Sequence, residues 1–534
     1  MKFFKILIIL FVFLPGFLLS QEYNYHDNND FKEVVMMNLN FSDSIVHTAF
    51  FPLRVSYCEQ IIGKENLFYN SKRTDFANKL PISWFWRKFL SEEFLVFKEN
   101  NIEFSISPLF NYYNTNAKGD SNFYGQNTRG FEVKGTLGKK LSFYTDFFET
   151  QAYFLPYIDQ VVVEDFIVPG QGSWKLFGDD QRGRDYNYAS GYFSYAPADF
   201  FNFQAGHSKQ FVGSGYRSML LSDNSYVYPF AKFTFTKGKW QYIAMFTEFQ
   251  SFKTKNYFYH YKKHGSFTFL NYSPFSNFEI GLFEGIIWQT SDDSTYVKNI
   301  PALYFVPVPF LREAVYGFDS EQNIILGLNT RIKVYKFGEF YGQFALNQFS
   351  VEDFNKRYSY QFGVKIYDVF AQKINGQRLF ILAEYNYAKP YSYTHELNHQ
   401  AYTHYNAPLA HPLGAGFSEF VGIANWNAYG FKLSYKLNIV KTATDTLGSN
   451  FGSDLLLTNN SANFENTFNF VGQGNQTYIT SHNLELAYVV NPVTNIQLFV
   501  SVGKRNYLSE IAKDDLFFVS FGIKNAIKNF YYDF

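Results

Sequence analysis

The 534-residue sequence predicts an all-β fold: a transmembrane antiparallel β-barrel with a small N-terminal, partly helical periplasmic segment. Three observations predict it. Aromatic side chains are abundant, segments of about ten residues alternate apolar and polar positions, and short turns alternate with long polar loops along the chain. Counting the alternating segments gives about 18 strands, an even number as single-chain bacterial barrels require.

The composition favours a barrel over other membrane or soluble classes. Aromatic residues make up 22% of the chain, with 66 Phe and 43 Tyr, whereas charged residues make up only 18%. Beyond the N-terminus no apolar run approaches the roughly 18 residues that a membrane helix needs. The formal net charge is +0, so nothing indicates nucleic-acid binding or a polybasic membrane tether. The alternative at this point is a large soluble β-protein.

The N-terminal region divides into two expected parts. Residues 1–20 resemble a signal peptide, with Lys2 and Lys5 before an apolar run and a cleavage point near Ser20-Gln21. Residues 21–101 lack strand periodicity, so we expect them in the periplasm, with one short amphipathic helix within 84–98. Cys58 is the only cysteine, which excludes an internal disulfide framework and a lipid-modified N-terminal cysteine.

Residues 102–524 carry the barrel signature. In the segment 495–502 the apolar residues Leu498, Val500 and Val502 fall on one face, and Gln497 and Ser501 fall on the other. The same alternation recurs at residues 362–366, 431–437 and 517–524. In the second of these the polar face consists of Lys432, Ser434 and Lys436. We expect that face to line a hydrated lumen, because buried lysines are costly in lipid.

The connections between strands fall into two classes that alternate along the chain. Tight turns are expected at 138–139, 197–199, 237–238, 274–276, 336 and 491–493. Long polar loops are expected at 113–128, 154–188, 207–226, 253–264, 290–322, 349–357, 389–413, 441–476 and 506–514. Outer-membrane barrels show this asymmetry, with long loops facing outward, and a soluble sandwich has no reason to keep it. Residues 525–534 are expected as either a C-terminal strand or a periplasmic tail.

One segment matches the zinc-protease pattern H-E-x-x-H, at His395, Glu396 and His399. That pattern works when an α-helix presents both imidazoles on one face and the glutamate acts as a general base. The segment follows Lys389-Pro390 inside an expected external loop and lacks helical periodicity. We therefore predict no catalytic residues, no metal site and no cofactor.

Polar residues gather in the loop that follows the strand 200–206. His207, Lys209 and Arg217 are donors suited to acidic or hydroxyl-rich ligands, and Asp223 supplies an acceptor. The structural alternative is a loop that folds inward and plugs the lumen with its own hydrogen bonds. Both interpretations stay open at this stage.

Two blocks resemble a known group of proteins. Residues 206–224, GHSKQFVGSGYRSMLLSDN, and 404–417, HYNAPLAHPLGAGF, are similar to RemB-type gliding-motility proteins of Bacteroidetes, which look related to the Wzi capsule-assembly family. The resemblance implies an 18-stranded outer-membrane barrel with a small helical periplasmic part, associated with surface polysaccharide. Tyr402, His404 and His411, in or beside the second block, join the first four residues as candidate ligand-binding side chains.

The expected function is therefore that of a non-enzymatic outer-membrane protein. The resemblance implies that it would bind or assemble capsule or exopolysaccharide and support gliding motility or adhesion. Its aromatic, hydroxyl-rich loops suit sugars. The expected partners are outer-membrane lipid, surface polysaccharide and proteins of the gliding or secretion machinery, with no nucleic acid. A porin-like channel for small solutes is the main alternative, and an outer-membrane hydrolase is a third.

Overall fold

The computed structural model describes most of the chain. The described residues are 24, 28–63, 83–138, 140–252, 260–289, 291–292, 296–297, 302–309, 311, 322–347, 357–371, 373–374, 376–445, 449–458, 464, 468–525 and 528–534. The expected signal peptide, residues 1–20, and its cleavage point at Ser20-Gln21 lie outside the described residues. None of the described helices is long and apolar enough to cross a membrane.

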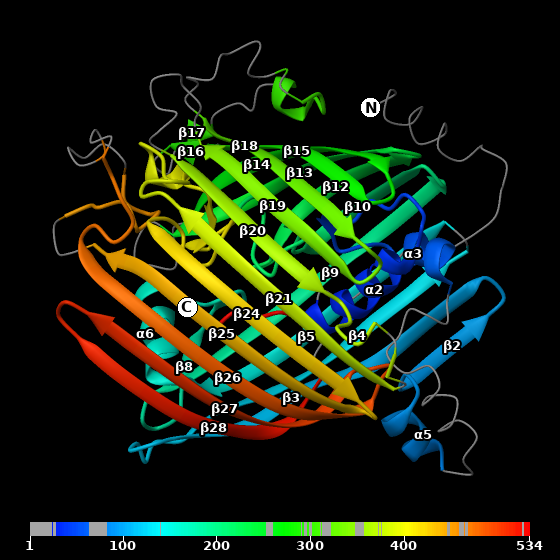
Figure 1. The fold of residues 1–534 in the computed structure, drawn as a ribbon, viewed down its shortest axis with the longest axis horizontal. Coiled ribbons are helices and arrows are strands. Elements are labelled where there is room, and N and C mark those ends of the chain that lie inside the picture. The colour runs from blue at the N-terminus through cyan, green and yellow to red at the C-terminus, as the bar shows by residue number, and fades with distance from the viewer. Residues whose placement is uncertain are drawn as a thin grey trace.

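Eighteen antiparallel strands close into one barrel, which confirms the predicted fold class (Figure 1). The strands are β3 (Ile102–Ala117), β4 (Tyr124–Leu137), β5 (Leu141–Tyr153), β9 (Gly183–Ala198), β10 (Phe201–Ser208), β12 (Tyr228–Lys237), β13 (Trp240–Phe252), β14 (His260–Phe275), β15 (Phe278–Gln289), β18 (Asn323–Val334), β19 (Gly338–Asn347), β20 (Tyr358–Ile366), β21 (Gln377–Ala388), β24 (Phe417–Ala428), β25 (Phe431–Thr444), β26 (Asn475–Asn491), β27 (Ile496–Ser509) and β28 (Lys513–Asn525). β28 pairs with β3, from Phe518↔Ala117 to Lys524↔Asn111, so no long sheet edge is left open.

The alternation read from the sequence sets the two faces of the wall. Leu498 and Val500 are exposed on the outside of β27, whereas Gln497 and Ser501 are buried on the inside. On β20, Phe362 is 62% exposed while Gln361 and Lys365 are buried. An apolar outer face and a polar inner face are what a lipid-embedded barrel requires.

Turns and loops lie at opposite ends of the barrel, here called the turn end and the loop end. The tight turns connect strands at the turn end, on the right in Figure 1, and α6 (Pro156–Asp165) with the small two-stranded ribbons lies at the loop end. Two expected long loops are short, because β3 and β4 leave only 118–123 between them and β27 and β28 leave only 510–512. The remaining short elements are η2 (Ala302–Phe305), η3 (Asn398–Gln400), β6 (Ile167–Val168), β7 (Gly172–Ser173), β8 (Lys175–Phe177), β16 (Ser291–Asp292), β17 (Tyr296–Val297), β22 (Thr403–His404) and β23 (Ala407–Pro408).

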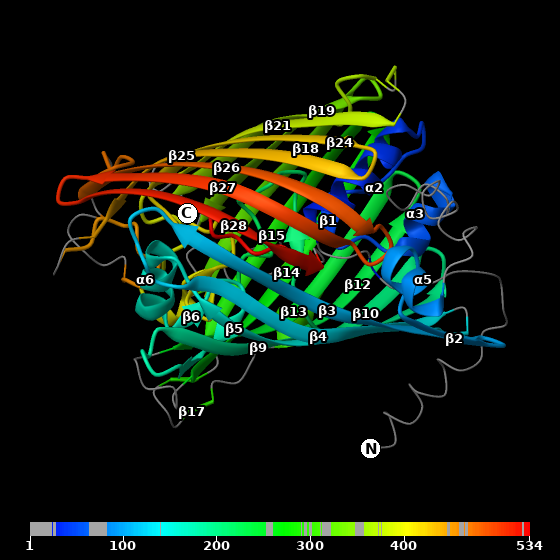
Figure 2. The same ribbon diagram turned by 90° about the horizontal axis from the view of Figure 1, so that it is seen from below.

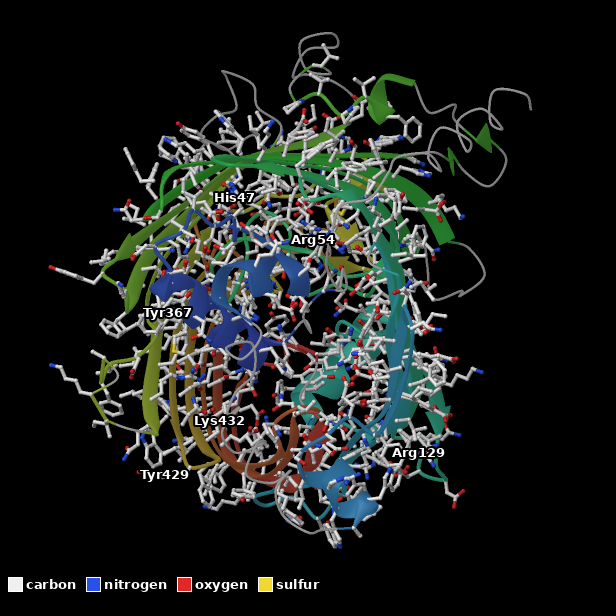
Figure 3. The ribbon with its side chains drawn as sticks, turned by 90° about the vertical axis from the view of Figure 1, so that its right-hand side faces the viewer. His47, Arg54, Arg129, Tyr367, Tyr429 and Lys432 are labelled. Carbon is white, nitrogen blue, oxygen red and sulfur yellow. The ribbon has the colours of Figure 1, made fainter. Side chains whose placement is uncertain are left out.

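Residues 28–63 of the N-terminal segment lie inside the barrel rather than apart from it. The helices α2 (Asn29–Phe41) and α3 (Val55–Ile62) fill the lumen near the turn end, as the end-on view shows (Figure 3). α2 begins where the Asn28 side chain accepts a hydrogen bond from the Asp30 amide at 2.7 Å. One face of α2 packs Val35 and Met36 into a core with wall residues of β21 and β24. The sequence predicted a periplasmic location, and the structure differs because this apolar face finds its partners inside the barrel.

Polar contacts and a short ribbon hold the same segment in place. The Thr48 amide donates to the Glu279 carboxylate of β15 at 3.0 Å, and Glu33 accepts from Arg378 of β21 at 3.2 Å. β1 (Phe50–Phe51) pairs with β11 (Phe211–Val212), which belongs to the loop after β10. The N-terminal segment and that loop therefore form one packed unit within the lumen.

The expected helix within 84–98 is shorter than predicted. α5 spans Trp84–Leu90, and residues Leu95–Glu99 form the strand β2, which pairs with the first residues of β3. β28 covers β3 only over Asn111–Ala117, so the edge of β3 near the turn end is free to accept β2. The apolar residues from Leu95 to Phe97 suit a strand as well as they suit a helix, which is why spacing alone gave the wrong element.

The C-terminal residues form neither of the two expected structures. β28 ends at Asn525, and the described residues 528–534 return through the lumen without forming a strand. The Tyr157 hydroxyl of α6 donates to the Tyr532 carbonyl at 3.0 Å, so the tail runs back to the loop end, and the C-terminus lies near α6 in both side views (Figures 1 and 2). Buried partners along this path explain why the tail does not stay outside the barrel.

Candidate functional site

Four segments together fill much of the lumen, and we call them the plug. They are residues 28–63, 209–227, 389–416 and the tail 528–534. Of the seven predicted ligand-binding residues, six lie in the plug segments 209–227 and 389–416, and these six are at most 4% exposed. The inward-folding alternative considered for the first loop is the arrangement that the structure shows.

Arg217 lies at the centre of a buried ion network. Its guanidinium is 3.0 Å from Glu419 of β24 and 3.0 Å from Asp533 of the tail. Although burial opposes the charged form, the carboxylates of Asp533 and Glu419 hold the pKa of Arg217 above its usual range. Burial also disfavours the charged form of Asp533, yet Arg217 and Lys436 hold the pKa of Asp533 well below its usual value. The network thus ties the loop, the wall and the tail together in their ionised forms.

His411 completes this network from the other loop. Its Nε2 atom is 2.6 Å from the second oxygen of Glu419, and its Nδ1 atom accepts a hydrogen bond from the Leu413 amide. Because Nδ1 accepts, Nε2 carries the proton and donates it to the carboxylate. Burial lowers the pKa of His411 against the attraction of Glu419, so the imidazole is a neutral donor here.

Asp223 and Lys209 hold the tail in a second place. Asp223 accepts hydrogen bonds from the Tyr531 hydroxyl at 2.9 Å and from the Asn529 amide at 3.1 Å. The Lys209 ammonium lies 5.3 Å from the centre of the Phe530 ring, a distance at which a cation–π interaction is favourable. Both side chains therefore stabilise the closed position of the tail.

Tyr402 and His404 join the two loops to each other, and His207 lies at their margin. The Tyr402 hydroxyl donates to the Leu220 carbonyl at 2.8 Å, and His404 bridges the Val227 carbonyl and the Gln250 amide, each at 3.1 Å. His207 is only half-buried and contacts the Ala189 carbonyl at 3.3 Å. The structure gives all seven residues contacts within the protein, and ligand binding by them stays a prediction.

The H-E-x-x-H segment does not have the geometry of a zinc protease. Only the three residues Asn398–Gln400 are helical, and they form a 3-10 turn. His395 accepts from the Leu397 amide, whereas the His399 ring stacks on Tyr261 at 4.2 Å, so no helical face presents the two imidazoles together. Within the described part of the chain, no three His, Cys, Asp or Glu side chains are grouped to hold a metal ion.

Acidification should loosen this loop. Burial lowers the pKa of His395 to about 4 and the pKa of His404 to about 3. An unfolded histidine binds a proton below about pH 6.5, so each buried imidazole stabilises the fold fully above that pH and progressively less below it. Between pH 6.5 and 5 the loss is roughly 2 kcal/mol per histidine. Melting temperatures should therefore fall between pH 7.5 and pH 5, and His404→Gln should reduce this dependence. If His404→Gln left the pH dependence of the melting temperature unchanged, the buried imidazole of His404 would not be its cause.

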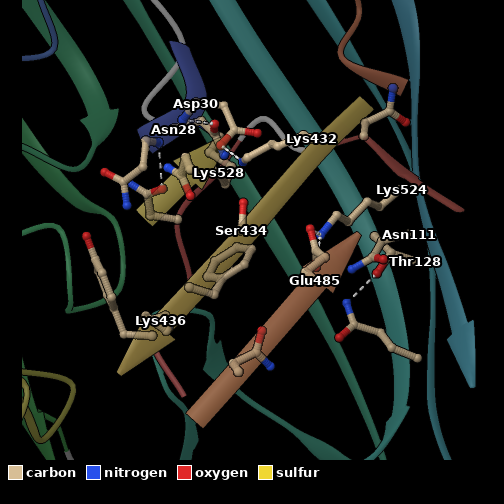
Figure 4. Close-up of a pocket in the computed structure, with 18 of the residues that line it drawn as sticks. Asn28, Asp30, Asn111, Thr128, Lys432, Ser434, Lys436, Glu485, Lys524 and Lys528 are labelled. Carbon is tan, nitrogen blue, oxygen red and sulfur yellow. Dashed lines mark hydrogen bonds and ion pairs between the residues drawn. The ribbon is translucent and has the colours of Figure 1, made fainter. Parts of the chain in front are cut away.

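A cavity remains between the plug and one side of the wall. Its first chamber, of about 320 Å³, begins at Asn28–Asp30, where α2 starts, and follows the inner face of β25 and β26 (Figure 4). A second chamber, of about 430 Å³, reaches Leu155 and Tyr157 at the loop end. The chambers share part of their lining, so they adjoin along the lumen; the shared residues are Asn111, Gln126, Lys436, Asn483, Glu485, Lys524, Lys528 and Phe530.

The lining combines paired charges, amides and rings. Lys432 binds Asp30 of α2, and Lys524 binds both oxygens of Glu485 at 2.9 and 2.8 Å. The Ser434 hydroxyl points into the same space and has no hydrogen-bond partner among the described residues. Phe148 and Phe530 contribute aromatic surface. Such a surface can hydrogen-bond hydroxyl groups and stack on apolar ring faces, which are the contacts that sugars need.

Sequence reasoning anticipated only part of this lining. Lys432, Ser434 and Lys436 were placed on the lumenal face of their strand by alternation, and the structure confirms that face, but they were not singled out as a site. Asp30 and Lys528 had no such signal, because they lie in segments whose inward fold was not predicted.

Comparison with known proteins shows the fold. No protein-family model matches the chain, and no curated protein matches it either. The structure of Wzi from Escherichia coli, described as an outer-membrane protein involved in group 1 capsule assembly and a carbohydrate-binding β-barrel, matches 95% of this chain and 100% of its own with a TM-score of 0.53 at 12% identity.

Two further structures match over less of the chain. OccAB2 of Acinetobacter baumannii covers 79% of this chain and 97% of its own, with a TM-score of 0.43 at 8% identity. OprD of Pseudomonas aeruginosa covers 78% and 94%, with a TM-score of 0.40 at 10% identity. The chain therefore has the fold of an 18-stranded outer-membrane β-barrel, the architecture that it shares along its length with Wzi.

Proposed function

We propose that this protein is a non-enzymatic component of the outer membrane that binds surface polysaccharide. Through that binding it would support capsule or exopolysaccharide assembly and gliding motility or adhesion. The observation that carries the proposal is the pair of adjoining chambers beside the plug, lined by amides, paired charges and aromatic rings. The likeness to Wzi, a carbohydrate-binding barrel, supports it. Membrane lipid, the polysaccharide and proteins of the gliding or secretion machinery are the proposed partners.

A porin-like channel for small solutes is the second candidate. The adjoining chambers favour it, because together they extend along the wall from α2 toward α6. The plug argues against it, since Arg217 and Asp533 join loop and tail across the lumen through a buried ion pair. Diffusion of solutes would require that these contacts open.

A hydrolase is the third candidate, and a single substitution tests it. Glu396 is the only residue of the sequence motif that would act as a general base. If purified protein shows proteolysis or lipolysis that Glu396→Gln removes, the non-enzymatic proposal is wrong. We expect wild type and variant to be alike.

A clean deletion of the gene separates the first two candidates. We expect loss of capsule or exopolysaccharide retention and weaker surface spreading, with unchanged uptake of small solutes. Complementation with the wild-type gene should restore retention and spreading. Normal retention and spreading together with reduced solute permeability would favour the porin and refute our proposal.

A further inference from the structure

The charges that line the first chamber are balanced one against another. The four lysines of this chamber each contact a carboxylate: Lys432 with Asp30, Lys524 with Glu485 at 2.8 Å, Lys436 with Asp533 at 2.8 Å, and Lys528 with Asp146 at 2.8 Å. Two further basic residues are consecutive on β27. Both belong to the second chamber, where Arg505 donates to the Phe534 carbonyl and lies against the Tyr157 ring rather than a carboxylate. The Lys504 side chain is exposed on the outward face with Val502.

From this balance we infer that the first chamber binds an uncharged saccharide segment in preference to an acidic one. The inference rests on the proposed function and adds to it the chemical class of the sugar. A site for a polyanion would present basic side chains that lack a carboxylate partner, because their charge is what the ligand must neutralise.

An acidic sugar would meet unfavourable electrostatics in the first chamber. To bind Lys524, a uronate carboxylate would have to displace Glu485, which uses both of its oxygens on that ammonium group. Glu485 would then lie in a partly buried site without its partner, beside a second negative charge. Breaking a desolvated ion pair in this way is costly, so an acidic ligand loses more than it gains.

An uncharged sugar can form hydrogen bonds with polar atoms of the lining that do not take part in the ion pairs. The hydroxyl of Ser434 and the amide oxygen of Asn111 are buried in the lining and have no hydrogen-bond partner within the described chain. Each ammonium group carries three protons, so Lys524 and Lys432 can donate to a ligand without leaving their carboxylates. Sugar hydroxyls both donate and accept, which suits this mixture of groups.

The dimensions of the cavity suit a short stretch of sugar units. The two chambers measure about 320 and 430 Å³, within the range of about 300–1,000 Å³ typical of small-molecule sites. The Phe530 ring belongs to both chambers and offers a surface on which the apolar face of a pyranose can stack. The tail is thus part of the proposed binding surface as well as part of the plug.

Titration calorimetry on the purified full-length protein tests this inference with two probes of similar size, maltotriose and trigalacturonate. We expect maltotriose to bind at least about tenfold more tightly than trigalacturonate, with little dependence on salt, because no net charge is neutralised. If neither probe binds, the cavity is not a saccharide site, and the inference fails together with the observation that carries the proposed function. If trigalacturonate binds as tightly or more tightly, polysaccharide binding stands and the inferred preference is wrong.

A substitution that removes the carboxylate of one ion pair should reduce the preference of the site for maltotriose over trigalacturonate. Glu485→Gln keeps the shape of the side chain and leaves Lys524 without its carboxylate, so trigalacturonate should bind about tenfold more tightly than it binds wild type. Glu510→Gln, at an exposed position in the turn between β27 and β28, is the matched control and should change neither affinity. Wild-type affinity of Glu485→Gln for trigalacturonate, with heat-modifiable mobility showing a folded barrel, would contradict the inference.

Discussion

Arg217→Ala should destabilise the closed protein by about 3–5 kcal/mol, the usual effect of removing one partner from a buried ion network. The substitution leaves Glu419 and Asp533 facing each other as buried carboxylates without their shared cation. Arg217→Lys should rescue little, because one ammonium group cannot reproduce the forked contacts of a guanidinium. Urea unfolding in detergent micelles measures the change.

Arg182→Ala is the control for this experiment. Arg182 is also paired with a carboxylate, that of Asp180 at 3.0 Å, but both side chains are more than a third exposed. Exposed pairs of this kind contribute about 0–1 kcal/mol, so the unfolding midpoint should hardly move. Equal effects of the two substitutions would contradict the claim that the Arg217 network holds the plug.

Removal of residues 528–534 should open the lumen to ions. The tail lines both chambers and meets the loop 209–227 through the Tyr531–Asp223 hydrogen bond and the Arg217–Asp533 ion pair. Without it the two chambers widen, and Arg217 and Lys436 lose one carboxylate partner each. Planar-bilayer recordings should show steady ionic conductance for the shortened protein and little for the full chain.

Asp533→Asn serves as the comparison for the shortened protein. It removes the charge but keeps the volume of the tail, so its conductance should stay below that of the protein without residues 528–534. A shortened barrel that remains folded by heat-modifiable mobility and conducts no better than the full chain would show that the tail is not a barrier.

The wall of the barrel could be predicted because its pattern is local. The alternation within a single strand shows which residues face outward and which face the lumen, as with Phe362 and Gln361 on β20. The tight turns mark where one strand ends and the next begins. The number of strands followed from counting such segments. At Leu95–Glu99 the pattern fitted both a helix and a strand, and these residues form a strand because they pair with the free edge of β3. That edge is free because the distant strand β28 pairs only with the later part of β3.

The plug could not be predicted in the same way. The ion pair of Arg217 and Asp533 joins residues 316 positions apart, and nothing in either local sequence indicates the other. The same polar residues that suit an exposed ligand-binding loop also suit a loop folded inward, since both need donors and acceptors. His404 and Tyr402 were read as candidate ligand-binding residues for that reason, whereas the structure engages them in hydrogen bonds to backbone atoms.

The lining of the cavity could be predicted only in part. Alternation placed Lys432, Ser434 and Lys436 on the lumenal face of β25, but their role depends on what lies opposite them. Asp30 reaches Lys432 across 402 residues of sequence, so the balance of charge is visible only in three dimensions.

Binding of the organism's own surface polysaccharide by a cavity-filling variant tests the central claim most directly. Ser434→Trp places a large ring in the first chamber, whereas Leu433→Trp places the same ring on the opposite face of the same strand. With both proteins folded, as judged by heat-modifiable mobility, surface plasmon resonance should show that Ser434→Trp loses at least about 90% of the binding and Leu433→Trp keeps it. Undiminished binding by Ser434→Trp would contradict the claim that the lumenal cavity is where this barrel holds polysaccharide.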